Sequence, residues 1–404
     1  MKKTLIILLS IFMISFNKIT TKAATGKSFF TMGTYVEVNL YNQGSEADYQ
    51  KIEEIYTYYD YLGSDSIRPD SPYQALEYVY SINLKRNEAV TVNDDLFELI
   101  KFSMNMMVET NGYFNPLIGE AVDIWKQLIK THGGTTISQQ VYDETIAMLK
   151  EIPPIEATDI ELDETNKTVK LLNHAKLDLG AIAKGYATEK AVQYIKSKNI
   201  TTYNINAGSS SIAFGIHPEN RPFSTGLNDP YRLYKDNIFE GQALYAIIKV
   251  KDAHIVTSGD YLQYVKYGDK ILHHILDPHD YMPKNYYHTI TIMGDDGGKL
   301  DAYSTAIFNM PEAEAISFLD AQNMHYSFYK KDEVTHNFSE ENYRIFKRKT
   351  DDENTDPTDP INPLPSDDSN SNILILIFIL SGIVVVFGSI ITVMIIKERQ
   401  QKHE

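Results

Sequence analysis

The sequence contains no cysteine in its 404 residues. Disulfide bonds, thiolate metal ligands and a lipid-modified N-terminal cysteine are therefore excluded. Basic residues are also in the minority, because 38 Lys and Arg stand against 54 Asp and Glu, for a net charge of −16. Nucleic-acid backbones are bound by clustered basic residues, so this balance argues against a nucleic-acid partner. Any anionic ligand would need a local cation.

The first 24 residues have the layout of a cleavable export signal. Two lysines precede an apolar run over residues 5–15, and the small pair Ala23 and Ala24 follows. The run is too short to span a bilayer comfortably. We predict cleavage after Ala23 or Ala24, and retention of the segment as an uncleaved anchor is the alternative.

The other end of the chain predicts a membrane anchor. Residues 373–396 carry no charge, and a helix that rises about 1.5 Å per residue would cross a hydrocarbon core of about 30 Å over this length. Residues 350–372 are rich in Asp, Asn, Ser and Pro, which predicts a disordered stalk, and the basic tail 397–404 favours the cytoplasmic side. We therefore expect a single-pass protein of the cell membrane whose folded segment, residues 26–349, lies outside the cell.

The folded segment mixes strand and helix patterns. Alternating apolar residues predict strands at 34–41, 203–206 and 287–293, a hairpin at 160–171 and an extended piece at 176–179. Helical spacing predicts helices after the N-caps Ser45 and Asn93 and over 183–198 and 300–319. The predicted strands and helices follow one another in an irregular order without an internal repeat, which favours an α+β fold with mixed or antiparallel sheets flanked by helices. The segment exceeds the usual size of one core, so one large domain and two closely packed lobes are both consistent with it.

An acid, two glycines and a lysine gather at the predicted start of the helix over 183–198, in the sequence Asp178-Leu-Gly-Ala-Ile-Ala-Lys184-Gly-Tyr-Ala187. The unpaired N–H groups of such a helix start suit an anionic ligand. The spacing of the glycines is not that of a P-loop. A plain helix start with Lys184 in solvent is the alternative.

Asp301 and Thr305 stand four residues apart and would share one face of a helix. A carboxylate and a hydroxyl one turn apart are hard oxygen ligands, of the kind that Mg²⁺ takes when substrate phosphate completes its shell. The alternative is an N-terminal cap at Asp301 with a buried Thr305.

Two adjacent histidines, His273 and His274, precede Asp277. Consecutive residues of a strand point to opposite faces, so this pair cannot easily ligate one zinc ion. One histidine facing a cleft as an acid–base group is the functional interpretation. A packing or hydrogen-bonding histidine is the alternative.

Taken together, the order and spacing of these stretches resemble the ApbE family, the FAD:protein FMN transferases. Six blocks follow the family order: Thr31-Met-Gly-Thr34, Asn111-Gly-Tyr-Phe-Asn-Pro116 through Trp125, Asp178 to Ala187, Thr257-Ser-Gly-Asp260, His273 to Pro278, and Asp301 to Ala306. The chain departs from the family pattern at Ser209 to Ser211 in place of a second Gly and an acid, at Asp280-Tyr281 in place of Thr-Gly, and at Asn115 and Leu117 in place of Asp and Thr.

The resemblance implies a T-fold-like domain that splits FAD at its pyrophosphate and releases AMP. FMN would be joined by a phosphoester to a Thr or Ser hydroxyl of an exported acceptor protein. It implies that Mg²⁺ is held by the side chains of Asp301 and Thr305 and the carbonyl of Ala181. It also implies that the FAD site is lined by Met32, Tyr73, Tyr113, Phe114, Asn115, Asp178, Lys184 and Ile275. With the metal ligand Asp301, we expect His274 to be catalytic, as the group that accepts the proton of the acceptor hydroxyl.

Two other functions stay open at this stage. A Mg²⁺-dependent FAD pyrophosphatase would use water in place of the acceptor hydroxyl and release FMN. A non-catalytic flavin-binding surface protein would not need both Asp301 and Thr305. A purely structural adhesin would not explain six blocks in the family order.

Overall fold

In the computed structural model of this chain, residues 26–230, 244–330 and 333–346 are described. Four predicted segments lie outside them: the export signal at 1–24, the stalk at 350–372, the membrane span at 373–396 and the tail at 397–404. Within the described ranges, no helix is both long enough and apolar enough to cross a membrane.

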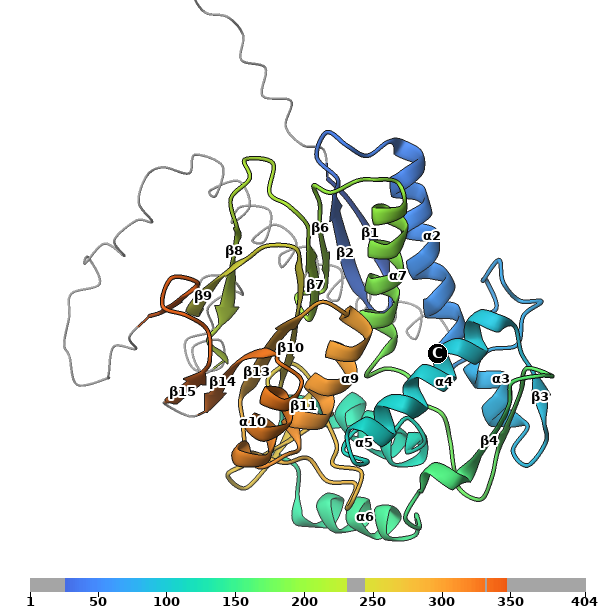
Figure 1. The fold of residues 1–404 in the computed structure, drawn as a ribbon. Coiled ribbons are helices and arrows are strands. Elements are labelled where there is room, and N and C mark those ends of the chain that lie inside the picture. The colour runs from blue at the N-terminus through green and yellow to red at the C-terminus, as the bar shows by residue number, and fades with distance from the viewer. Residues whose placement is uncertain (1–25, 231–243, 331–332, 347–404) are drawn as a thin grey trace, which may run out of the picture.

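An eight-stranded sheet forms the centre of the fold (Figure 1). Its strands are, in spatial order, β1 (Lys27–Thr31), β2 (Thr34–Asn39), β6 (Asn204–Ala207), β7 (Ser211–Phe214), β10 (Ala253–Gly259), β13 (Thr289–Gly294), β14 (His325–Lys330) and β15 (Glu333–His336). Every neighbouring pair in this sheet is antiparallel. The three single strands predicted from alternating apolar residues are confirmed as β2, β6 and β13.

Helices cover one face of the central sheet (Figure 1). Helices α7 (Ala183–Ser197) and α9 (Gly297–Phe308) pack on β7, β10 and β13, and α2 (Glu46–Leu62) packs on α7 and β1. The other helices are α3 (Val79–Leu84), α4 (Asp94–Glu109), α5 (Gly119–His132), α6 (Gln139–Lys150), the short 3₁₀ helix η1 (Ala157–Asp159) and α10 (Glu312–Ala321).

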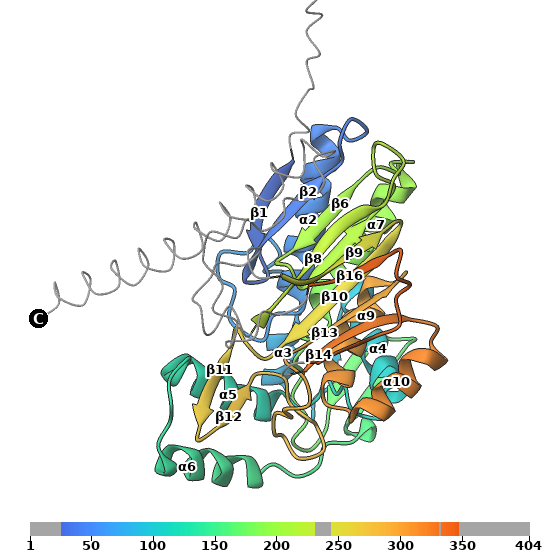
Figure 2. The ribbon, with the colours of Figure 1, turned by 90° about the vertical axis from the view of Figure 1, so that its left-hand side faces the viewer.

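A small sheet covers the opposite face of the central sheet (Figure 2). It consists of β16 (Tyr343–Ile345), β9 (Leu244–Val250) and β8 (Phe223–Asn228). Adjacent residues of β10 show the two faces, since Val256 belongs to the large core that includes the helices and Ile255 to the core of the small sheet. The central sheet is therefore buried on both faces, in a three-layer α+β arrangement.

Two further pairings lie beside the helices. Strands β3 (Val90–Thr91), β5 (Thr168–Leu171) and β4 (Ile160–Asp163) form a three-stranded sheet, and β11 (Tyr264–Tyr267) pairs with β12 (Lys270–His273). The predicted hairpin at 160–171 is confirmed as β4 and β5. The extended piece predicted at 176–179 belongs to no sheet, because Lys176 and Asp178 bond the loop carbonyls of Leu117 and Pro116 instead.

The predicted helix starts after Ser45 and Asn93 are confirmed. Each side chain accepts a hydrogen bond from a first-turn N–H, at 3.4 Å from Asp48 and 2.9 Å from Leu96. The prediction of one helix over 300–319 is wrong, because α9 and α10 are separate helices with Pro311 between them. Proline lacks an N–H and disfavours helical backbone at the residue before it.

Candidate active site

The N-terminal turns of α7 and α9 meet backbone to backbone. A Cβ atom at Gly185 would lie 2.2 Å from the carbonyl oxygen of Gly297 and 2.5 Å from Cβ of Asp301, so a larger residue there would push the helices apart. Asp301 Oδ2 accepts a hydrogen bond from the Gly185 N–H at 2.8 Å. This contact brings the predicted metal ligand Asp301 to the start of the helix that carries Lys184.

Asp301 is a buried carboxylate with 7% of its surface exposed. Burial raises the pKa of Asp301, while the charge of Lys184 and the Gly185 N–H act in the opposite direction. A bound cation beside this side chain would offset the cost of burying its charge. The environment of Asp301 therefore suits a metal ligand.

Asp301 and Thr305 lie one turn apart on α9, as predicted from their spacing. Thr305 Oγ1 donates to the Asp301 carbonyl at 3.3 Å. The N-cap of this helix is Asp296, whose side chain accepts from the Lys299 N–H, so the alternative of an N-cap at Asp301 is wrong. Both side-chain oxygens of the predicted metal pair therefore come from the body of one helix.

The third predicted ligand, the Ala181 carbonyl, does not receive its usual helical hydrogen bond, because of the same contact between the helices. In a regular helix the Gly185 N–H would bond the carbonyl four residues before it, which is that of Ala181. Here this N–H donates to Asp301, and no backbone N–H in the described ranges bonds the Ala181 oxygen. Carboxylate, hydroxyl and carbonyl oxygens form a hard donor set that fits Mg²⁺.

These donors do not form a complete metal cage. No group of three or more His, Asp or Glu side chains in the part of the chain that the structure describes is arranged to hold a metal ion. Mg²⁺ commonly keeps water and substrate phosphate in its shell and takes one or two carboxylates from the protein. A metal at Asp301 would therefore depend on ligands from a substrate.

His274 follows β12, and its side chain keeps contact with solvent. Nδ1 lies 3.3 Å from the carbonyl oxygen of Gln263, which can only accept, so Nδ1 carries the proton and Nε2 is the acceptor of the neutral ring. The protein atoms packed around the ring exclude part of its water, and this desolvation lowers the pKa of His274 to about 4. The Gln263 carbonyl acts against this shift, and the charge of Lys184 adds to it. The ring is neutral at pH 7 and able to take up a proton.

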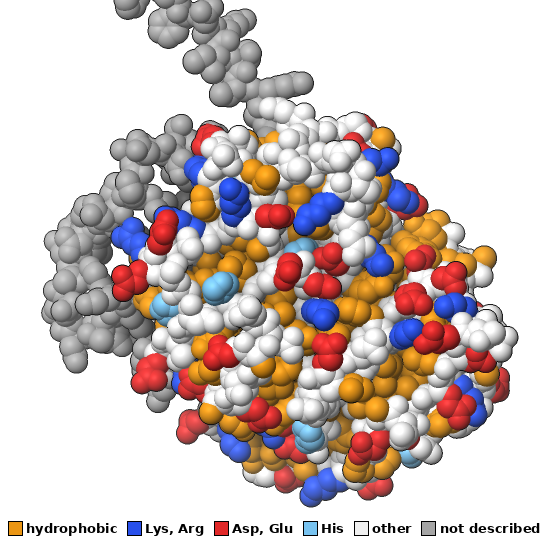
Figure 3. Space-filling model, viewed as in Figure 1, with side chains coloured by type: hydrophobic (Ala, Val, Ile, Leu, Met, Phe, Trp, Pro, Cys, Tyr) orange, Lys and Arg blue, Asp and Glu red, His pale blue; other side chains and the backbone are white. Residues whose placement is uncertain are grey.

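The Lys184 ammonium interacts electrostatically with both catalytic candidates. Its charge acts on the pKa of Asp301 and on that of His274. On the face shown in Figure 3, acidic and basic side chains are interspersed without a broad basic area. The cation that an anionic ligand requires is thus supplied locally, by Lys184 at a helix start.

The neighbouring histidine, His273, is a packing residue. It is fully buried, its Nδ1 accepts from the Ile275 N–H at 3.2 Å, and its Nε2 donates to the Lys284 carbonyl at 2.7 Å. Burial lowers the pKa of His273 to about 3, and the ring edge packs against Phe308. His273 is buried and His274 is exposed, so the prediction that the two histidines face opposite sides is confirmed. The predicted FAD contact Ile275 is buried next to them in sequence.

Lys126 is a neighbour of the candidate site that the sequence patterns do not predict. Its ammonium lies 2.6 Å from Asp178 Oδ2 and 2.9 Å from Asp65 Oδ2. Although burial acts against its charge, the two carboxylates raise the pKa of Lys126. Its place directly after Trp125, at the end of the second sequence block, is the signal that could have found it.

The sequence model of the ApbE family matches residues 32–328, which is most of the chain. This chain belongs to the ApbE family. Two solved ApbE structures share its fold. The crystal structure of the ApbE protein from Thermotoga maritima MSB8 has a TM-score of 0.62 at 24% identity and covers 77% of this chain and 96% of that one. The flavin transferase ApbE from Vibrio cholerae has a TM-score of 0.58 at 17% identity, with 78% and 96% covered.

Several relatives of this chain are FAD:protein FMN transferases. One from Klebsiella pneumoniae (strain 342) is 28% identical over 223 residues, which are 55% of this chain and 64% of that protein. One from Treponema pallidum (strain Nichols) is 24% identical over 296 residues, 69% of this chain and 76% of that protein. A match to a Rhodobacter capsulatus transferase spans 39% of that relative, so the chain leaves part of each relative unmatched.

The turn after α4 holds three of the FAD contacts expected from the ApbE pattern. The Tyr113 ring is partly open and packs edge-on against His279, with centroids 4.8 Å apart. Phe114 is 2% exposed within the core, and the amide of Asn115 bonds backbone groups on both sides. Of the three side chains, Tyr113 is the one placed to meet a ligand, while Phe114 and Asn115 fix the turn.

Met32 and Tyr73, the other expected ApbE contacts, lie at the edge of the large core. Met32 and Gly33 have φ values of +50° and +71° at the centre of the β1–β2 turn, the left-handed pair of a type I′ hairpin. The Tyr73 ring packs edge-on against Tyr58 at 5.1 Å. Neither side chain hydrogen-bonds to Lys184 or Asp301 in the described ranges, so their role rests on the family resemblance.

Two departures from the ApbE pattern fall on left-handed backbone where that pattern has glycine. Tyr281 has a φ of +59° and Ser209 a φ of +61°. Tyr281 is buried, its hydroxyl donates to the Pro153 carbonyl at 2.6 Å, and its own carbonyl accepts from the Trp125 indole N–H at 2.8 Å. The tyrosine thereby anchors the loop after His274 onto α5.

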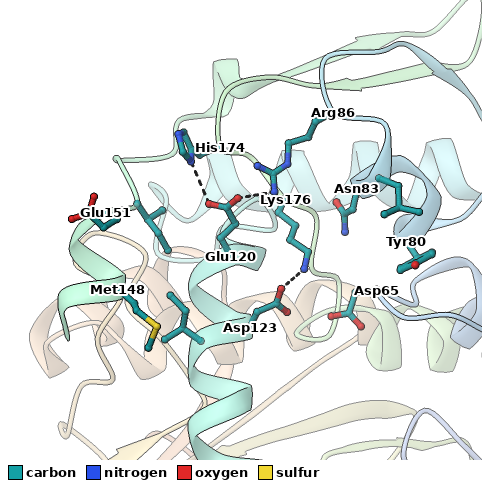
Figure 4. A pocket seen from close by; sticks show the side chains of 13 residues that line it. Asp65, Tyr80, Asn83, Arg86, Glu120, Asp123, Met148, Glu151, His174 and Lys176 are labelled. Carbon is teal, nitrogen blue, oxygen red and sulfur yellow. Dashed lines mark hydrogen bonds and ion pairs between the residues drawn. The ribbon is translucent and has the colours of Figure 1, made fainter. Parts of the chain in front are cut away.

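A hollow of about 610 Å³ lies between α3, α5 and α6 (Figure 4). Two of its basic side chains pair with acids of α5: Arg86 with Glu120 at 2.6 Å, and Lys176 with Asp123. None of the predicted site residues lines this hollow, so it is separate from the candidate active site. Asp65 on its wall is also a partner of Lys126.

Proposed function

We propose that this chain is a Mg²⁺-dependent FAD:protein FMN transferase. The observation that carries the proposal is the contact between the starts of α7 and α9, where the buried Asp301 accepts from the Gly185 N–H at 2.8 Å, next to Lys184 in sequence. The charge of Lys184 also acts on His274. Membership of the ApbE family and the names of its relatives support FAD as the substrate and a protein as the acceptor.

In the proposed reaction, a Thr or Ser hydroxyl oxygen of the acceptor attacks the phosphorus in the FMN half of FAD. A new phosphoester bond forms, the bond from this phosphorus to the bridging oxygen breaks, and AMP leaves with that oxygen. The hydroxyl proton passes to Nε2 of His274, the ring nitrogen that the Gln263 carbonyl leaves free.

Phosphoryl transfer depends chiefly on positioning and on neutralising the charge of the phosphate oxygens. Lys184 would supply one fixed positive charge to the diphosphate. Asp301, Thr305 and the Ala181 carbonyl would hold Mg²⁺, which when bound adds positive charge at the phosphate oxygens. The flavin and adenine parts would be bound by the remaining expected contacts: Met32, Tyr73, Tyr113, Phe114, Asn115, Asp178 and Ile275.

One assay separates this function from its alternatives. The purified protein is mixed with FAD, Mg²⁺ and proteins exported by the same cell, and flavin fluorescence in denaturing gels and AMP are measured. A fluorescent acceptor band with AMP supports the transferase. AMP and free FMN without a band would identify an FAD pyrophosphatase, and bound intact FAD would identify a flavin-binding surface protein.

We also propose that the enzyme acts outside the cell, held to the membrane by residues 373–396. The acceptors would then be exported proteins on the same side of the membrane. Deletion of residues 373–404 should release the protein into the medium, and protease added to intact cells should digest the full-length protein. Retention of the truncated chain in the cytoplasm would contradict this location.

A further inference from the structure

A second contact between α7 and α9 mirrors the one made by Asp301. Glu189 Oε2 accepts a hydrogen bond from the Gly297 N–H at 3.3 Å, while Asp301 Oδ2 accepts from the Gly185 N–H at 2.8 Å. Gly185 and Glu189 are four residues apart on α7, and Gly297 and Asp301 are four apart on α9. Each helix thus binds a first-turn N–H of the other with a carboxylate one turn further along.

The two glycines make this exchange sterically feasible. A Cβ at Gly297 would lie 2.9 Å from the Gly185 carbonyl oxygen, and a Cβ at Gly185 would lie 2.2 Å from the Gly297 carbonyl oxygen. Contacts this short require that both positions lack a side chain. Because the backbones touch, a small shift of one helix would move the opposite carboxylate by a similar amount.

Glu189 is itself held by a buried histidine. His254 is 3% exposed, and its Nε2 lies 3.2 Å from Glu189 Oε2. Its other ring nitrogen, Nδ1, is buried and has no hydrogen-bond partner among the residues that the structure describes. Nε2 is therefore the ring nitrogen that donates to Glu189, and this bond fixes the carboxylate at the start of α9.

Glu189 is ionised in this position. Burial acts to raise its pKa, but hydrogen bonds from His254, Gln193 and the Gly297 N–H, together with the His254 charge, leave the pKa of Glu189 below its ordinary value. A carboxylate beside the first N–H groups of a helix is also favoured by the helix dipole. The bond from the Gly297 N–H to Glu189 is thus charge-assisted.

We infer that Glu189 is a positioning residue for the metal site, which sets the register of α7 against α9 and so the place of Asp301 and Thr305 relative to the Ala181 carbonyl. The inference rests on the proposed function, because Mg²⁺ and FAD are the ligands of that site. Glu189 touches neither Asp301 nor Thr305 by a hydrogen bond in the described ranges, and it acts through the Gly297 backbone.

The test is the affinity of the full-length protein for Mn²⁺, measured without turnover by electron paramagnetic resonance in the presence of AMP. Glu189→Ala should weaken Mn²⁺ binding roughly 10- to 100-fold, the usual cost of losing a partner behind a metal ligand. Glu189→Gln keeps an oxygen for the Gly297 N–H and His254, and should restore most of the affinity. In the transfer assay, Glu189→Ala should lower kcat with little change in KM for FAD.

Glu109→Ala is the matched control. Glu109 also ties α9 to a neighbouring helix, by accepting from the Tyr303 hydroxyl and pairing with Lys299, but it contacts these side chains and not the Gly297 N–H. Its loss should leave Mn²⁺ affinity within about twofold of wild type. Equal Mn²⁺ affinities in wild type and Glu189→Ala, or equal losses in both Ala variants, would overturn the inference. Absence of transfer by a wild-type protein that binds Mn²⁺ would instead count against the proposed function alone.

Discussion

Lys126 and Asp178 form an ion pair of 2.6 Å that joins α5 to the loop before α7. The pair is reinforced on its other side by Asp65, and the Gly180 N–H donates to Asp178 Oδ1 at 2.9 Å. The expected FAD contact Asp178 is therefore held in one orientation by its neighbours. Through Asp65, the ion pair also links the loop before α7 to the wall of the hollow in Figure 4.

Lys126→Met should weaken FAD binding, because Asp178 would lose the cation that orients it. The Lys126 side chain is 49% exposed, so solvent screens the pair and the effect should be about 0.5–1 kcal/mol, a two- to fivefold rise in KM. Steady-state kinetics with varied FAD measures it. Lys130→Met, one turn further along the same helix, is the control and should leave KM unchanged. An equal KM in both variants would rule out an orienting role for Lys126.

Asp301→Asn should lower acceptor labelling by about 100-fold or more, because a metal contributes several kcal/mol to stabilising charge in the transition state. The asparagine side-chain oxygen can still accept from the Gly185 N–H, so the far-UV circular dichroism spectrum should not change. The rate is followed by in-gel flavin fluorescence, with the exposed neighbour Asp295→Asn as control. Normal labelling by Asp301→Asn would remove the metal assignment.

His274→Asn should slow transfer by about 100-fold or more, within the usual range for a general base. A base must be neutral, and the pKa of His274 is lowered to about 4 from its ordinary value of about 6.5. The wild-type rate should therefore be flat near pH 7 and fall only as the pH drops toward this lowered pKa of about 4. His325→Asn, at an exposed end of β14, serves as control. Transfer at the wild-type rate by His274→Asn would disprove the role.

Tyr281→Gly tests two opposing effects at a left-handed residue. Glycine would relieve about 1–2 kcal/mol of backbone strain, but removal of a buried aromatic ring costs about 3–5 kcal/mol. The loss outweighs the relief, so the free energy of unfolding in urea should fall by roughly 2 kcal/mol. Tyr281→Phe loses the bond to the Pro153 carbonyl alone and should cost about 1 kcal/mol. A more stable glycine variant would show that strain dominates.

Features encoded by neighbouring residues could be predicted from the sequence. Ser45 and Asn93 are caps whose bonds reach three residues ahead, and the alternation in β2, β6 and β13 reflects burial of the central sheet. The stretch from Asp178 to Ala187 predicts a helix start, because its glycines and lysine lie within a few residues of one another. The prediction of a single helix over 300–319 is wrong for an equally local reason. The apolar residues keep helical spacing through this range, although Pro311 ends the first helix.

Contacts between distant residues could not be predicted in this way. The bond between Gly185 and Asp301 joins positions 116 residues apart, and the pair of Lys126 and Asp178 spans 52 residues. Neither leaves a periodic signal in the sequence, because each depends on how α5, α7 and α9 pack. The family pattern supplied the residues of the site, and the packing of these helices supplies their geometry.

Trp125 is the single tryptophan of the chain, and its indole N–H is bonded to the Tyr281 carbonyl in the loop after His274. Intrinsic emission excited at the red edge of indole absorption therefore comes from one known place in the protein. Flavins absorb in the region where indole emits, so energy transfer would quench this signal when FAD binds. Ligand binding, loop movement and their rates can thus be followed optically in the unlabelled wild-type protein.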